Sequence, residues 1–91
     1  MLQKTKVSQF NGKNGVVKNQ FEIITQDGKF FQSYDSVIAF IPNDGSKIKL
    51  DSKYWDYSIT TSKYRNQFLG ENKKATEDKI KLGLYELTNL N

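Results

Sequence analysis

The sequence predicts one small α+β domain, in which an antiparallel sheet of four or five strands is covered on one face by two short C-terminal helices. Three observations predict this fold. Ninety-one residues are too few for a second hydrophobic core. Up to residue 50, apolar residues alternate with polar ones between turn residues, as in strands. From about residue 60, apolar residues recur at helical spacing and are followed by glycines.

The first two expected strands are Lys4–Phe10 and Val16–Thr25. Between them, Asn11–Gly15 supplies Asn and Gly, which tolerate the positive φ of a hairpin loop. Asp27–Gly28 predicts a second tight turn, and the aromatic residues of 30–34 predict a strand after it. The first part of the chain therefore reads as consecutive antiparallel strands.

A turn or bulge is expected near Asp35–Ser36, before a short apolar strand at Val37–Ile41. Pro42–Gly45 has the composition of a turn, because Pro fixes φ and Gly accepts strained backbone. Lys47–Leu50 alternates strictly and predicts a strand with one solvated face. The strand-rich region is thus 4–50, and a meander is its simplest topology.

The first helix is indicated by Tyr64, Phe68 and Leu69, which lie at i, i+4 and i+5. Gly70 follows directly as a helix stop. Thr60, or the threonine after it, can cap the start by accepting a backbone N–H. We therefore expect a helix from about residue 60 to residue 69.

The second helix is expected to begin at Thr76, where two carboxylates in the next positions suit the helix dipole. Gly83 is expected to end it. These two helices make residues 58–83 the helix-rich region. Residues 84–91 form an apolar tail that we expect to pack back on the sheet.

The chain contains no histidine and no cysteine. These absences exclude imidazole acid–base chemistry, thiol nucleophiles, disulfides and zinc-finger ligation. Asp35, Asp51 and Asp56 could in principle hold Mg²⁺, but Asp35 and Asp51 each precede a serine and are more simply turn formers. We therefore expect no catalytic residues, no metal and no cofactor, and a protein that is not an enzyme.

The net charge is +4, from 14 basic and 10 acidic residues. A basic bias favours a polyanionic partner, and it is equally explained by the Lys- and Asn-rich composition of AT-rich genomes. The sequence has no apolar run long enough for a signal peptide or a membrane span. We expect a cytoplasmic protein without membrane contact.

The segment Tyr54–Gly70 is the most informative part of the chain, because it holds its one Trp and its one Arg. Exposed Trp, Tyr and Arg dominate binding hot spots. Trp55 can alternatively fill the core between sheet and helix, and the polar helix residues can be a solvated face. The candidate partner-binding residues are Tyr54, Trp55, Tyr57, Lys63, Arg65, Asn66 and Gln67.

Three segments carry a resemblance to a small family of uncharacterised proteins from bacteriophages and mobile plasmids. They are SYDSVIA at 33–39, LDSKYWDYSITTSKYRNQFLG at 50–70 and KIKLGLYELTNLN at 79–91. The resemblance implies a phage or plasmid accessory protein in the host cytoplasm. Such proteins often block host defences, so it also implies an anti-CRISPR-like inhibitor of a host protein or ribonucleoprotein complex.

We expect such an inhibitor to block a nucleic-acid or activation surface; mimicry of DNA is disfavoured because the chain is basic. The alternative is a small nucleic-acid-binding regulator. It could stack bases on sheet aromatics, drawn from Phe10, Phe21, Phe30 and Phe31. It could instead use a helix-turn-helix over residues 68–83, although acids at the start of the second helix and a long gap after Gly70 oppose this.

Overall fold

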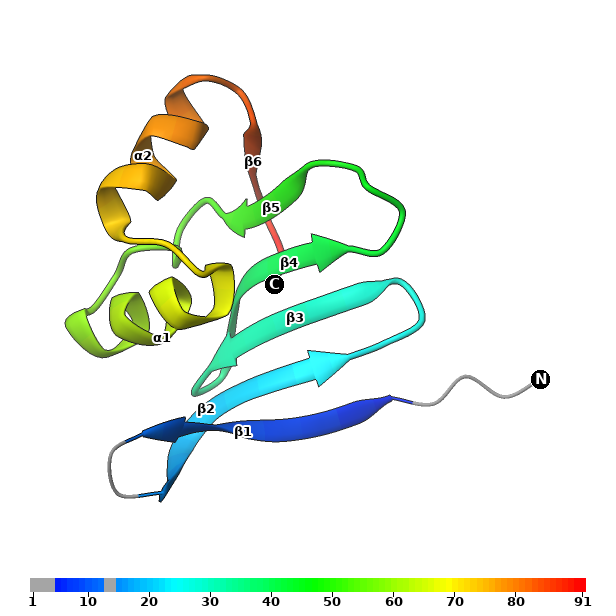
Figure 1. Cartoon of the computed structure of the whole chain (residues 1–91), viewed down its shortest axis with the longest axis vertical. Coiled ribbons are helices and arrows are strands. Elements are labelled where there is room, and N and C mark those ends of the chain that lie inside the picture. Colours follow the sequence, from blue (N-terminus) through cyan, green and yellow to red (C-terminus); the bar gives the residue numbers. More distant parts are fainter. Residues whose placement is uncertain (1–4, 13–14) are drawn as a thin grey trace.

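The computed structural model describes residues 5–12 and 15–91. Within these ranges, six strands form one sheet and two helices lie together at one end of it (Figure 1). The elements are β1 (Lys6–Gly12), β2 (Gly15–Ile24), β3 (Gly28–Ser33), β4 (Ser36–Pro42), β5 (Ile48–Asp51), α1 (Ile59–Leu69), α2 (Lys73–Lys81) and β6 (Tyr85–Thr88).

The α+β class is confirmed, and five strands precede the two helices as predicted, but a sixth strand follows them. β1 to β5 form the expected antiparallel meander, each strand pairing with the next. The strand count and the all-antiparallel sheet were wrong, because the tail forms a sixth strand parallel to β5. The chain leaves β5, passes through both helices and returns to the same edge, so β6 runs in the same direction as β5 (Figure 1).

The predicted turns lie where expected. Turns separate β2 from β3, β3 from β4 and β4 from β5. Gly28 is required at the second turn: its φ is 153°, and a Cβ there would lie 2.2 Å from the carbonyl oxygen of Ile41. The hairpin expected at Asn11–Gly15 joins antiparallel strands that end with the pair Gly12 and Gly15, and its tip at 13–14 lies outside the described residues.

Both helices begin earlier than predicted. Ser58, not a threonine, caps α1 by accepting a hydrogen bond from the backbone N–H of Thr61 at 3.1 Å. Asn72, not Thr76, caps α2. Thr61 and Thr76 are buried, and their hydroxyl groups make other hydrogen bonds. Thr61 is hydrogen-bonded to Ser33 at 2.8 Å, and Thr76 donates to Glu71 at 2.6 Å. The predicted stop at Gly70 is confirmed by its left-handed conformation, φ 71°.

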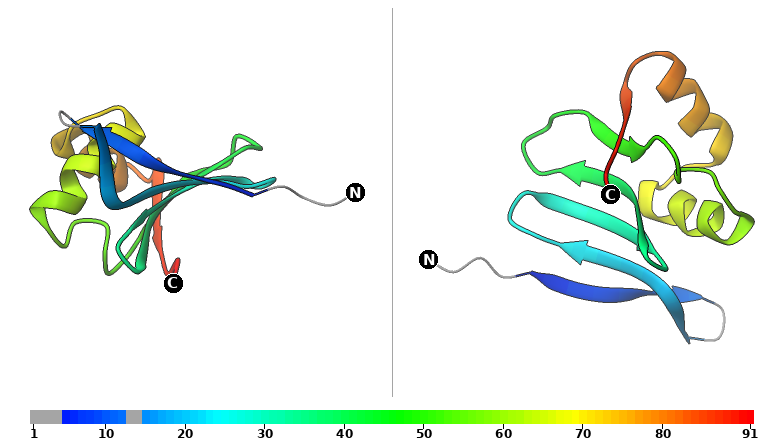
Figure 2. Two further views of the ribbon diagram at one scale, coloured as in Figure 1. Left: turned by 90° about the horizontal axis from the view of Figure 1, so that it is seen from below. Right: turned by 180° about the vertical axis from the view of Figure 1, so that it is seen from behind.

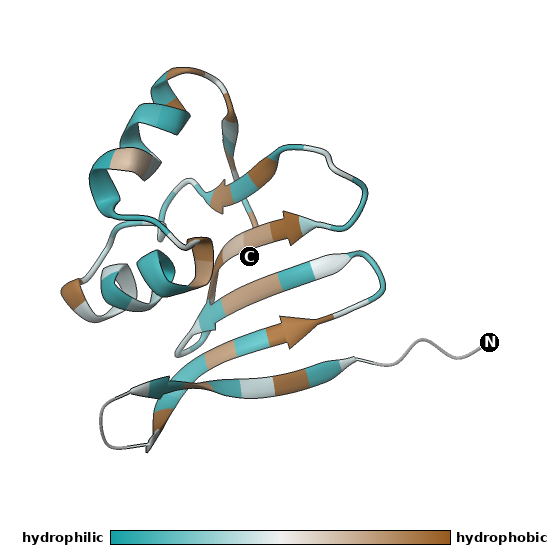
Figure 3. Ribbon diagram, in the orientation of Figure 1, coloured by the Kyte–Doolittle hydropathy of each residue, from teal (hydrophilic) through white to brown (hydrophobic). Residues whose placement is uncertain are grey.

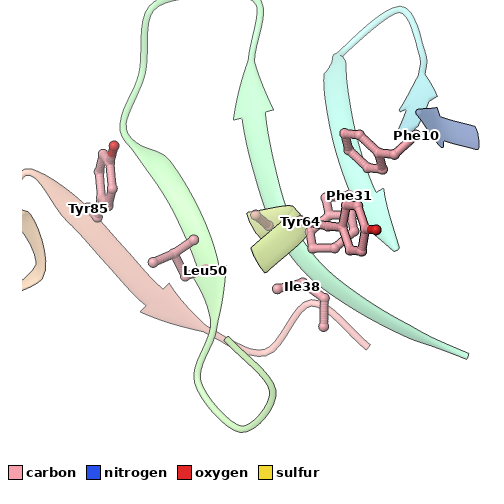
Figure 4. Packing of buried hydrophobic residues seen from close by; sticks show 7 residues of the cluster. Phe10, Phe31, Ile38, Leu50, Tyr64 and Tyr85 are labelled. Atoms are coloured by element: carbon pink, nitrogen blue, oxygen red, sulfur yellow. The ribbon is translucent and has the colours of Figure 1, made fainter. Parts of the chain in front are cut away.

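The hydrophobic core lies between α1 and one face of the sheet (Figure 4). Phe31 of β3 is fully buried, and its ring lies 5.8 Å from that of Phe68 on α1. Phe10 of β1 lies 6.0 Å from Tyr64, also on α1. The two helices crowd one end of the strands and leave the rest of the sheet uncovered by helix (Figures 1 and 2). The core is therefore small and one-sided.

Within the described ranges, neither helix has the length and apolar character that a bilayer span requires.

Candidate partner-binding surface

Arg65 is fully buried, so its predicted place on an exposed polar arc of α1 is wrong. It belongs to the face of α1 that packs inward, together with Thr61, Tyr64 and the half-buried Phe68, at i, i+3, i+4 and i+7 from Thr61. Tyr64 and Phe68 already marked this face in the sequence. An arginine between them was read as polar and exposed, although its helical position places it inside.

The guanidinium of Arg65 organises the loop between β5 and α1. Its Nη1 donates to the carbonyl oxygen of Trp55 at 2.6 Å and lies 3.3 Å from Oδ1 of Asp56. The cation also lies 5.2 Å from the centre of the Trp55 ring, a cation–π contact. Its Nη2 donates to the side-chain oxygen of Asn66 at 3.1 Å. Arg65 therefore positions the aromatic loop from within and does not itself reach a partner.

Asp56 connects this loop to both helices. Its carboxylate lies 2.8 Å from Nζ of Lys73 on α2 and accepts a 2.8 Å hydrogen bond from Ser62 on α1. Burial alone would raise the pKa of Asp56, but hydrogen bonds from Lys73, Ser62 and Arg65 outweigh it and hold the pKa below its ordinary value. Asp56 is thus held as a carboxylate among three donors.

The aromatic residues of the loop divide between core and surface. Trp55 and Tyr54 are half-buried and pack against the core cluster. Tyr57 is 45% exposed, and its ring meets that of Tyr54 edge-on at 5.4 Å. Trp55 therefore packs against the core, as the second of its two alternatives predicted. Tyr57 is the most exposed of these three aromatic residues.

One stripe of α1 faces solvent. Ile59, Lys63 and Gln67 lie four residues apart along it, and all three are exposed. The exposed fraction of Ile59 reaches 91%. Asn66 is half-buried, and its backbone carbonyl accepts the capping N–H of Gly70. The predicted positions of Lys63 and Gln67 on an exposed face are confirmed, whereas Ile59 was missed because it precedes the predicted helix start.

We call Tyr57, Ile59, Lys63 and Gln67 the α1 surface. At its N-terminal end lies a shallow groove of about 380 Å³, bordered by Tyr57, Ile59 and the ion pair of Asp56 with Lys73. The surface combines an aliphatic side chain and an ammonium group on α1 with an aromatic ring in the loop before it. The hydrogen bonds of Arg65 hold this loop against the helix. These are the components of a contact with a macromolecule, where apolar groups supply burial and charges supply orientation.

The three aspartates weighed as a magnesium site do not come together. Asp51 is almost fully buried, and its oxygens accept hydrogen bonds from the backbone N–H groups of Lys53, Tyr54 and Leu90. Asp56 is paired with two cations. Across residues 5–12 and 15–91, no three metal-ligating side chains gather. Asp51 and Asp56 therefore connect separate parts of the chain through hydrogen bonds and ion pairs.

The two nucleic-acid alternatives are altered by the structure. Phe10 and Phe31 are core residues and cannot serve as stacking platforms, whereas Phe21 and Phe30 lie on the opposite, uncovered face. The turn between the helices is short, not long, because α2 begins at Lys73. One sequence argument against a helix-turn-helix was therefore wrong.

The fold and surface together define the class of protein: a small α+β domain in which a helix pair packs at one end of a six-stranded mixed sheet. The chain belongs to the family described as Family of unknown function (DUF8033), whose model matches residues 4–83. No curated protein and no solved structure matches the chain. The role of the protein must therefore be argued from its own surface.

Proposed function

We propose that the protein is a non-catalytic accessory protein of a phage or mobile plasmid that binds and inhibits a host defence complex, in the manner of an anti-CRISPR protein. The α1 surface makes the contact. Inhibition is stoichiometric: the bound domain covers a nucleic-acid or activation surface of its target. The resemblance of residues 33–39, 50–70 and 79–91 to proteins of such elements supports the phage or plasmid origin.

The single observation that carries a binding role is the exposed side chain of Ile59 on an otherwise fixed helix. Burying an isoleucine side chain against a partner stabilises a complex by about 1.5–3 kcal/mol. Lys63, one turn further along α1, supplies positive charge beside it. The partly buried hydrogen bonds of Arg65 keep the preceding loop in place, so little conformational entropy is lost on binding.

The charge of this surface favours steric blocking over mimicry of DNA. Lys63 belongs to the α1 surface, and Lys73 and Asp56, which border its groove, neutralise each other, so the surface carries a net positive charge. An imitation of DNA would need carboxylates there to reproduce the phosphates. An acidic protein surface or an exposed guide RNA is the complementary target of such a patch.

Phage plaque formation tests this function. In bacteria whose CRISPR system targets an infecting phage, expression of the protein is expected to restore plaque counts toward those of a non-targeting strain. The panel should include DNA-cleaving and RNA-cleaving effectors, each with an empty-vector control. Plaque counts that stay at the empty-vector level for every system in the panel contradict the proposal.

A second candidate function, binding of duplex nucleic acid, is favoured by the compact turn between α1 and α2. Lys73 and Lys74 stand at the start of α2, where recognition helices make their contacts. Both are also paired with carboxylates, Lys73 with Asp56 and Lys74 with Asp78. If this function is correct, affinity for duplex DNA falls with salt at a log–log slope of about −0.9 per phosphate contacted. A protein target instead retains the domain at moderate salt.

A further inference from the structure

The face of the sheet opposite α1 carries a continuous row of paired residues. Because residues paired across neighbouring strands point to the same side of a sheet, the register places on this face a residue from each strand. From β1 to β6 the row is Val7, Ile23, Phe30, Phe40, Lys49 and Glu86. Four of its six members are apolar, and Phe21 stands beside them in the neighbouring row.

This row is separate from the core. The core residues of the same strands, such as Phe31, Ala39 and Leu50, alternate with it and point toward α1. Phe30 and Phe40 stack on each other instead, with ring centres 4.3 Å apart and planes 23° from parallel. Figure 3 shows apolar segments along β2, β3 and β4, and Figure 2 shows both helices gathered at one end of the sheet. Among the described residues, no helix contributes to this face.

The charges of this face are balanced. Lys49 and Glu86, the two charged members of the row, are paired across β5 and β6. Asp27 and Asp44, in the turns beside Phe40, line a shallow depression together with Lys49. A platform for single-stranded nucleic acid needs a basic groove for the phosphates, and these carboxylates oppose one. A flat apolar face with charges of both signs fits a protein surface of the same kind.

We infer that this face, which we call the open face, is the contact surface of a second copy of the chain. Each molecule carries a net charge of +4, so two copies repel each other unless they meet where the charge cancels. The open face is such a place. A twofold axis through it pairs sheet with sheet, as in a β-sandwich, and brings the Phe30 and Phe40 stacks of both copies out of water.

The size of the open face sets the strength of this dimer. Six strands are separated by five spacings of about 4.8 Å, and about five residues of each strand then give roughly 24 Å by 17 Å, or about 400 Å² per copy. Two copies then bury about 800 Å², which is below the size of standard specific interfaces and in the range of weak, transient ones. The dimer is therefore weak and forms reversibly.

Sedimentation equilibrium tests the inference with two neighbouring residues of β2 that point to opposite faces. Over about 10 μM to 1 mM protein, the average mass is expected to rise toward twice that of one chain. Ile23→Lys places an ammonium in the open face and is expected to leave a monomer at all concentrations. Ile24→Lys adds the same charge on the other face, at a side chain 37% exposed, and is expected to dimerise like the parent.

A monomer at every concentration overturns the inference, as does equal loss of association in Ile23→Lys and Ile24→Lys. Val7→Lys decides the question if Ile23→Lys does not fold by circular dichroism, since Val7 is 61% exposed and little burial is lost there. Binding of a single-stranded oligonucleotide that becomes tighter in Val7→Lys, where the new ammonium attracts phosphates, would assign the open face to nucleic acid instead. The proposed inhibition of host defence does not depend on this dimer, so the plaque assay and the sedimentation experiment can fail separately.

Discussion

Among the individual residues, Arg65 differs most from its prediction, because it is buried and was expected on an exposed face. Removing its side chain leaves the carbonyl of Trp55 without this donor in a partly buried site, while Asp56 keeps Lys73 and Ser62. Arg65→Ala is therefore expected to lower the free energy of unfolding by about 1–3 kcal/mol. Urea denaturation at neutral pH measures this loss. Lys63→Ala, an exposed position on the same helix, is the control and should change stability by less than about 0.5 kcal/mol.

Gln20 provides a second test at the residue scale. Its side chain is fully buried on β2, and neither its amide nitrogen nor its amide oxygen has a hydrogen-bond partner among the described residues. Gln20→Met keeps nearly the same shape and removes the polar atoms, so it is expected to raise the free energy of unfolding by about 1 kcal/mol. Thermal and urea unfolding check it. A loss of more than about 1 kcal/mol would mean that the amide is hydrogen-bonded after all.

At the scale of elements, substitutions at the observed and the predicted cap of α1 distinguish the observed start of the helix from the predicted one. Ser58→Ala removes the acceptor for the backbone N–H of Thr61 and is expected to cost about 1 kcal/mol. Thr60→Ala, at one of the two threonines that the sequence analysis considered as the cap, is expected to be neutral or slightly stabilising, because Thr60 is exposed within the first turn. Equal losses in the two variants would contradict the observed cap.

The sequence predicted the elements that depend on local patterns, namely strands β1 to β5 and both helices, better than it predicted contacts between distant parts of the chain. Turns such as Asp27–Gly28 depend on backbone preferences of their own residues, and these were placed correctly. β6 was missed because its pairing with β5 spans the whole helical region, which no local pattern records. The burial of Arg65 was also missed, because it depends on acceptors in a loop ten residues earlier along the chain. Lys63 and Gln67 could be placed because exposure follows from their helical spacing.

At the scale of the whole molecule, three carboxylates join separate parts of the chain. Asp51 binds the C-terminal residues, Asp56 binds both helices, and Glu71 binds Lys79 and Tyr85. For each, burial would raise the pKa, but the hydrogen bonds it accepts outweigh burial and leave the pKa below its ordinary value. Their stabilisation is therefore complete above the pKa of the unfolded chain, about 4, and is lost as pH falls through the lower folded values.

Thermal unfolding between about pH 2 and pH 8 measures this linkage. The midpoint temperature is expected to be level from about pH 5.5 to pH 8 and to fall steeply below about pH 4. Asp56→Asn should have a lower midpoint temperature at neutral pH, and this temperature should fall less than that of the parent as the pH is lowered. Asp35→Asn, in the exposed turn before β4, is the matched control and should retain the full acid dependence of the parent. The account is wrong on this point if the two variants show the same acid dependence.

The central claim is that the protein acts by surface contact through the α1 surface, and Ile59 tests it most directly. Ile59→Asp loses almost no burial in the free protein and places an acid in the first turn of α1, where the helix dipole favours it. Leu84→Asp is the matched control, because Leu84 is 56% exposed in the loop between α2 and β6, away from α1 (Figure 1). Plaque counts in the host strain whose defence the parent protein blocks are the measurement. We predict that Ile59→Asp, folded and at least as stable as the parent, fails to restore plaques while Leu84→Asp restores them fully. Full activity of Ile59→Asp would contradict the claim.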